Sequence, residues 1–142
     1  MTLTPKHASF LVQQGVNLEL AERLGVESVT KPTDLHKEWR AGLGRHTPGI
    51  VFPWTSHDGR VSPQLRPDNP RKDGEGKYIK YEFQTDSTPV LWAVRMNLTA
   101  TKILIVEGSK QCIVAAQYAP ADFAVFGLAG CWGFSHDEGN PI

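Results

Sequence analysis

The spacing of apolar residues predicts two short helices at the start of the chain. Residues 5–14 carry apolar side chains at near-helical spacing after a Thr-Pro start that suits an N-cap and a first turn, and Gly15 ends the segment. A second helix is predicted over residues 18–24, with Asn17 as its cap and Gly25 at its end. Such a pair of short helices is typical of a small helical cap that packs against the rest of a domain.

The middle of the chain changes to short extended segments. Residues 31–48 lack a clear period and are interpreted as a linker. The runs 50–54 and 61–65 flank an Asp-Gly turn and predict a hairpin, although Pro53 and Pro63 favour edge or irregular strands.

Beyond the hairpin, residues 66–77 combine proline, glycine and charge, as exposed loops do, and residues 78–83 alternate like a further strand. Within the loop, Gly74-Glu75-Gly76-Lys77 lacks the spacing of a phosphate-binding loop and is interpreted as a turn.

The last third of the chain predicts a strand, a helix and a second strand. Residues 102–106 form a nearly uninterrupted β-branched run, typical of a strand buried on both faces. Residues 109–118 predict a helix that Pro120 terminates, and residues 122–126 predict a second buried strand. This order favours a parallel βαβ unit, whose last strand we expect to leave an unpaired apolar edge.

The predicted fold class is therefore α/β, or α+β over the whole chain. A small helical cap and linker occupy residues 1–48. An irregular antiparallel β region and the parallel βαβ unit occupy residues 49–142, within one compact domain overall.

Composition narrows the classes of partner. The 142 residues include 15 basic and 15 acidic side chains, so the chain lacks the global positive field of many nucleic-acid binders, and such binding requires a local patch. No apolar run reaches the roughly 20 residues that cross a bilayer. With no secretory signal visible, we expect a cytoplasmic protein without a membrane partner. Cys112 and Cys131 are interpreted as buried, reduced thiols.

Glu107 is the first candidate site residue, because it ends the first predicted parallel strand and faces a glycine-rich stretch after the second. It could bind Mg²⁺ or handle a proton, or it could merely cap the following helix. No Ser/His/Asp arrangement can be assigned, since the five histidines are scattered and each is interpreted as solvated or packed.

The basic loop is the second candidate. Cations outnumber acids between residues 58 and 80, and Trp54, Tyr78 and Tyr81 flank them, as in sites that stack and neutralise single strands. Arg66, Lys80 and Tyr81 are the candidate contacts. A solvated loop of mixed charge is the alternative.

Three blocks of sequence carry a resemblance to a known family. They are Gly49-Ile50-Val51-Phe52-Pro53-Trp54 with Asp58-Gly59, then Arg66-Pro67-Asp68-Asn69-Pro70 leading to Lys80-Tyr81-Glu82, and finally Glu107-Gly108-Ser109-Lys110-Gln111 with Gly127-Leu128-Ala129-Gly130-Cys131-Trp132. In this order the chain resembles the Toprim-like domains found at the N-terminus of primase- or helicase-type replication proteins of phages, plasmids and mobile elements.

The resemblance implies a nucleic-acid-associated module in DNA replication, with Glu107 as a catalytic Mg²⁺ ligand and Lys110 near the phosphates. A Toprim site also needs an Asp-x-Asp pair at a later strand, and no such pair is present. We therefore expect weak or shared Mg²⁺ binding and no polymerase or nuclease activity from this chain alone. The expected partner is DNA or RNA, single-stranded.

Two alternatives belong to other classes of protein. One is a non-enzymatic module that binds single-stranded nucleic acid. The other is a protein-interaction or regulatory fragment that associates with a replication protein or with itself.

Overall fold

The computed structural model describes residues 3–84 and 87–129. Both predicted N-terminal helices are present. The N-cap hydroxyl of α1 (Pro5–Gln13) is that of Thr4, which accepts a hydrogen bond from the backbone N–H of His7. Asn17 caps α2 (Leu18–Arg23) in the same manner. These caps satisfy N–H groups that lack partners within the helix, which is why the sequence locates both starts correctly.

The N-terminal part of the β structure is a four-stranded antiparallel sheet in the order β1-β2-β3-β4. The predicted hairpin is β2 (Gly49–Thr55) and β3 (Val61–Pro67), paired in one continuous register. β1 (Glu27–Val29) was not expected, and the strand predicted over residues 78–83 is reduced to β4 (Glu82–Phe83).

The expectation that prolines make the hairpin strands irregular or peripheral is wrong, because β2 and β3 are the two central strands of their sheet. Pro53 and Pro63 lie opposite one another. β1 pairs with β2 only as far as Val51, and β4 begins its pairing with β3 at Gln64. Each proline therefore lies where its strand has a partner on one side only, a position at which the missing N–H is tolerated.

The segment expected to be a linker is folded and buried in part. It forms the short helices η1 (Pro32–Asp34), η2 (Lys37–Trp39), α3 (Arg40–Leu43) and η3 (Gly44–His46). Leu35 and Leu43 are at most 1% exposed. They complete a hydrophobic cluster on one face of the sheet with Val29, Val51 and Leu65.

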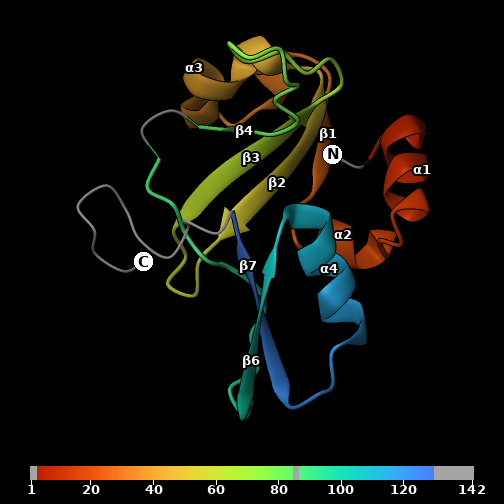
Figure 1. The fold of residues 1–142 in the computed structure, drawn as a ribbon, viewed down its shortest axis with the longest axis vertical. Coiled ribbons are helices and arrows are strands. Elements are labelled where there is room, and N and C mark those ends of the chain that lie inside the picture. Colours follow the sequence, from red (N-terminus) through yellow and green to blue (C-terminus); the bar gives the residue numbers. More distant parts are fainter. Residues whose placement is uncertain (1–2, 85–86, 130–142) are drawn as a thin grey trace.

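The second sheet contains the predicted βαβ unit. β6 (Lys102–Glu107) and β7 (Phe123–Leu128) are parallel and are connected by α4 (Ser109–Tyr118), as expected. β5 (Trp92–Arg95), which the sequence did not indicate, pairs antiparallel with β7. The fold is therefore mixed α+β, with a four-stranded antiparallel sheet and a three-stranded mixed sheet (Figure 1).

The strand order β5-β7-β6 corrects two expectations. β7 is the central strand and does not leave an unpaired edge. β6 is an edge strand that is not buried on both faces, since Ile103 is 66% and Ile105 41% exposed. A β-branched run indicates strand propensity, whereas burial depends on which neighbours the strand acquires.

A shared hydrophobic core joins the two sheets and the helices. Apolar residues of α1, α2, β2, β5, α4 and β7 pack into one cluster around Trp54 and Trp92, whose rings stack with centroids 5.6 Å apart. Cys112 is buried there as a free thiol, as expected, while Cys131 lies outside the described residues. The core thus spans the boundary that the sequence suggested at residue 48.

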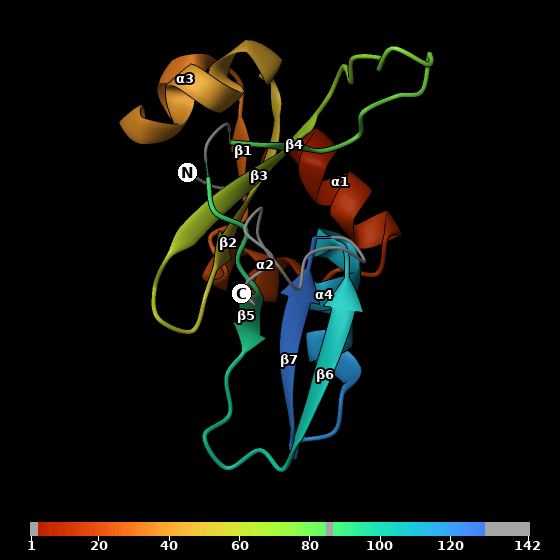
Figure 2. The ribbon, with the colours of Figure 1, turned by 60° about the vertical axis from the view of Figure 1, so that its left-hand side comes forward.

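The turn between α1 and α2 is tied to α4, and Figure 2 shows the three helices on the same side of the molecule. The Gln117 side chain accepts a hydrogen bond from the backbone N–H of Asn17 at 2.8 Å and donates one to the carbonyl of Gly15 at 3.0 Å. None of the helices in the described ranges has the length and apolar character required to cross a bilayer.

Candidate nucleic-acid interface

A cleft of about 600 Å³ lies between β3 and the turn from β6 into α4. Its other walls come from the segment that leads into β4. The lining residues are Gln64, Arg66, Lys80, Tyr81, Phe83, Glu107, Gly108, Ser109, Lys110, Gln111 and Ala129. The structure thus brings together all of the candidate residues from the basic loop and from the Glu-Gly turn.

A chain of hydrogen bonds fixes the two walls of the cleft against each other. The Trp54 indole Nε1 donates to the Ser109 hydroxyl at 2.9 Å, and that hydroxyl donates to Oε1 of Gln64. All three residues are at most 5% exposed. The first turn of α4 is consequently held against the hairpin, although residues 64 and 109 are far apart in the sequence.

Two cations of the cleft share an aromatic support. The guanidinium carbon of Arg66 lies 4.1 Å from the ring centroid of Phe10, and the Lys110 ammonium lies 5.1 Å from the same centroid. Lys110 also donates a hydrogen bond to the Gln14 side chain at 2.9 Å. α1 therefore takes part in the site, a role that sequence reasoning missed because Phe10 looks like an ordinary apolar residue of a helix.

The positive charges are close enough to affect one another. Partial burial lowers the pKa of Lys110, and the charges of Arg66 and Lys80 lower it further. Burial raises the pKa of Tyr81 against the opposing influence of Arg66, so its phenol stays protonated at neutral pH. An anion in the cleft would relieve the repulsion among the three cations.

Glu107 projects from the end of β6 and is exposed. Gly108, the N-cap of α4, has a φ of 90° and provides no side-chain cap. Within the described part of the chain, no hydrogen bond or ion pair involves the Glu107 carboxylate. The alternative role of Glu107 as the helix cap therefore has no bond to support it.

The donor set that the described residues offer around Glu107 does not fit a Mg²⁺ ion. Among residues 3–84 and 87–129, no three His, Cys, Asp or Glu side chains gather in a way that could ligate a metal. The neighbours of Glu107 along the cleft include Arg66, Lys80 and Lys110. Hard divalent cations require several oxygen ligands, and the positive charges of these three side chains oppose the binding of such an ion.

Most of the basic loop is paired and points elsewhere. Arg60 forms an ion pair with Asp58 at 3.0 Å, Arg71 binds the Glu82 carboxylate at 2.6 Å, and Lys77 pairs with Glu75 at 3.6 Å. Lys72 lies over the ring of Tyr78. The structure thus separates Arg66 and Lys80, which line the cleft, from the other cations of the loop.

The aromatic residues expected beside the cations differ in solvent exposure and in whether they line the cleft. Trp54 is 1% exposed and cannot serve as an open stacking surface, which corrects the expectation for it. Tyr78 is exposed but does not line the cleft, whereas Tyr81 does. Phe83, which the sequence did not single out, is 37% exposed and lines the cleft as well.

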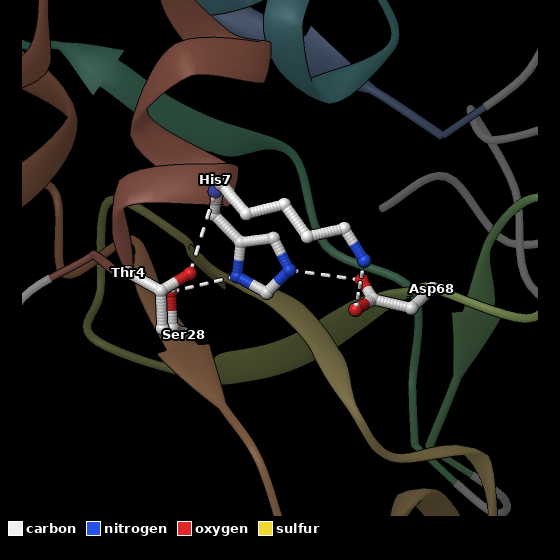
Figure 3. Close-up of polar contacts among 5 residues, drawn as sticks. Thr4, His7, Ser28 and Asp68 are labelled. Carbon is white, nitrogen blue, oxygen red and sulfur yellow. Dashed lines mark hydrogen bonds and ion pairs between the residues drawn. The ribbon is translucent and has the colours of Figure 1, made fainter.

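A buried histidine, His7, connects α1 to β1 and to the residue that follows β3 (Figure 3). His7 Nδ1 lies 2.7 Å from the Ser28 hydroxyl, and its Nε2 lies 2.8 Å from Asp68 Oδ1. Asp68 also accepts from the Lys6 ammonium at 2.7 Å. The sequence interpretation of His7 as a packed histidine is correct, but these partners were missed because they lie 21 and 61 positions away.

This Ser-His-Asp contact does not have the form of a hydrolytic triad. The serine contacts Nδ1 and the aspartate contacts Nε2, the reverse of the arrangement in serine hydrolases. Ser28 is 1% exposed, and its hydroxyl already accepts a hydrogen bond from the Thr4 backbone N–H at 2.8 Å. The contact instead attaches α1 to β1 and to the residue that follows β3, and so positions Phe10 beside Arg66.

Comparison with protein-family models, with curated proteins and with solved structures found no match for this chain. The family resemblance therefore depends on the sequence blocks quoted above, of which the part from residue 130 onward lies outside the described residues. The geometry of the cleft carries the functional argument.

Proposed function

We propose that the cleft binds the phosphate backbone of a single-stranded nucleic acid, and that the chain acts as a Toprim-like module of a primase- or helicase-type replication protein without catalysing phosphoryl transfer itself. One observation carries the proposal. Arg66, Lys80 and Lys110 line a single cleft, and Glu107 is the one carboxylate among the described residues that line it.

Electrostatics favours an anionic ligand over a cation in this cleft. Lys110 is already destabilised in its charged form by its two cationic neighbours. A bound phosphate would favour that charged form. The first turn of α4 contains no acidic residue, so its N-terminal end adds to the positive potential of the cleft.

A labelled oligonucleotide of single-stranded DNA or RNA, titrated by fluorescence anisotropy across a salt series, tests this proposal. Affinity should fall as salt rises, because bound phosphates release counterions. Arg66→Gln should reduce the slope of log affinity against log salt by about 0.7, the contribution of one phosphate contact on a single strand.

Arg60→Gln is the matched control, since Arg60 pairs with Asp58 and does not line the cleft. It should leave both affinity and slope unchanged. Absence of binding at low salt, or equal losses in the two variants, would contradict the proposal.

Glu107 is left with a subsidiary role, a shared contact to Mg²⁺ that would need carboxylates beyond the described residues of the cleft. Titration of Mg²⁺ by calorimetry into wild type and Glu107→Gln tests it. A response present in wild type and absent in the variant supports the shared ligand. Identical weak responses remove it.

Self-association at β6 is a second candidate function, supported by one observation. β6 is an edge strand that exposes Ile103 and Ile105. Exposed edge strands pair with other strands unless they are protected, and two copies of β6 would satisfy each other's backbone groups. Sedimentation velocity should show a dimer that Ile105→Lys disrupts, whereas a monomer at high concentration would exclude this function.

A further inference from the structure

A second, smaller cavity of about 190 Å³ adjoins the cleft. Phe83 and Ala129 line both spaces and separate them. Along β3, Ser62 lines the cavity, while Gln64 and Arg66 line the cleft. Alternate residues of a strand share one face, so the cavity and the cleft follow one another along the same face of the hairpin.

The small cavity has a different chemistry from the cleft. The described residues that line it are Trp54, Ser62, Phe83, Gln84, Ser87, Pro89, Val90 and Ala129, and none of these is charged. The rings of Trp54 and Phe83 meet edge to face, with centroids 5.8 Å apart. The Ser62 and Ser87 hydroxyls lie 3.1 Å from each other. The walls are thus aromatic and apolar, with a few neutral polar groups.

Gln84 helps to form one wall of the cavity. Its Nε2 donates to the backbone carbonyl of Glu38 at 3.0 Å, which ties the segment after β4 to η2. Its Oε1 has almost no accessible surface, so this oxygen is not open to a ligand in the cavity.

We propose that this cavity receives one base of the strand whose backbone lies in the cleft. The base stacks on Phe83, which lines both spaces and is 37% exposed. This inference rests on the proposed function, because the backbone in the cleft delivers the base. Single-stranded nucleic acids are commonly bound through unstacked bases that pack on aromatic side chains and hydrogen-bond through their edges.

Other occupants fit the walls less well. An anionic group would find no cation among the described lining residues. A cavity that holds only water is the remaining case, and the experiment distinguishes it from a bound base.

The test compares two oligonucleotides of equal length and charge, one of thymidylate and one with abasic sugars throughout. In wild type the thymidylate strand should bind about tenfold more tightly or better, the gain expected from stacking one base. Phe83→Ala should remove most of that difference. Tyr78→Ala, an exposed aromatic outside both spaces, is the matched control and should preserve the difference.

The outcomes separate the two proposals. Equal binding of abasic and thymidylate strands by wild type would overturn the base cavity and preserve the phosphate cleft. Failure of both strands to bind at low salt would overturn the phosphate cleft itself. A wild-type preference for the base that Phe83→Ala retains would also overturn the cavity, and the abasic strand shows whether that variant keeps a working cleft.

Discussion

Phe10 of α1 lies against the guanidinium group of Arg66 on β3, with 4.1 Å between the guanidinium carbon and the ring centroid. The contact joins the N-terminal helix to the cleft, and Lys110 of α4 approaches the same ring. Three elements that are remote in sequence therefore determine where the cations of the site lie.

Phe10→Leu is expected to weaken oligonucleotide binding about five- to thirtyfold. Each cation–π contact at a partly exposed site contributes about 0.5–1 kcal/mol, and both Arg66 and Lys110 lose one. Anisotropy measures the change, with Val12→Ala as the control because Val12 is 56% exposed on the same helix. Unchanged affinity in Phe10→Leu would show that the ring does not position the cations.

Binding is expected to weaken with rising pH on the alkaline side. In the free protein the Lys110 pKa is lowered by burial, Arg66 and Lys80, whereas a bound phosphate favours the charged form and raises it. Binding therefore takes up a proton between the two pKa values, and affinity falls as pH rises through that interval. Lys110→Arg, which stays charged, should remove this dependence, and an unaltered profile would exclude Lys110 as its source.

Ser28→Ala is expected to lower the free energy of unfolding by about 1–3 kcal/mol, because it leaves His7 Nδ1 and the Thr4 N–H without their buried partner. Urea denaturation measures the loss. Ser9→Ala, on the exposed side of α1, should change stability by less than about 0.5 kcal/mol. Similar values for the two variants would mean that His7 does not hold α1 in place.

Gly127→Ala is expected to destabilise the fold by about 1–3 kcal/mol, because the core must shift to admit a methyl group. A Cβ at this position would lie 2.7 Å from Cys112 Sγ and 3.2 Å from the Trp92 Cβ. Gly74→Ala is the control, since a Cβ there meets nothing within 4 Å. Equal melting temperatures for the two variants would contradict the close packing of β7 on α4.

Local signals account for what the sequence predicted well. Thr4 and Asn17 are capping residues in the sequence and in the structure, and the Asp-Gly turn places the hairpin. The limits of α4 follow from the Gly108 before it and the Pro120 shortly after it. Each of these elements depends on neighbours within a few residues.

What the sequence did not predict depends on pairing at long range. β1 and β5 span three and four residues, too few for a recognisable period, and they form because β2 and β7 offer free edges. Because β5 pairs with β7, β7 is the central strand and β6 is the exposed edge strand. The sequence of residues 102–106 carries no signal for this strand order.

The residues of the candidate site also fall into those that local signals identified and those whose roles depend on contacts between distant segments. Glu107 was identified by its place at a strand end, Lys110 through the family resemblance, and Arg66 and Lys80 by local charge. Phe10, Phe83 and Gln84 were missed because their roles arise from contacts between distant segments. Ion pairing within the loop, as between Arg71 and Glu82, decides which cations are available, and that too is a property of the fold.

Because the Trp54 indole donates a hydrogen bond to Ser109, a residue of the cleft, its fluorescence can report on ligand binding there. Any displacement of the first turn of α4 alters the polarity sensed by this indole, which also stacks on Trp92. Emission wavelength and the exciton couplet of the stacked pair should therefore follow occupancy without an attached dye, and the chain can be screened for ligands in its unmodified form.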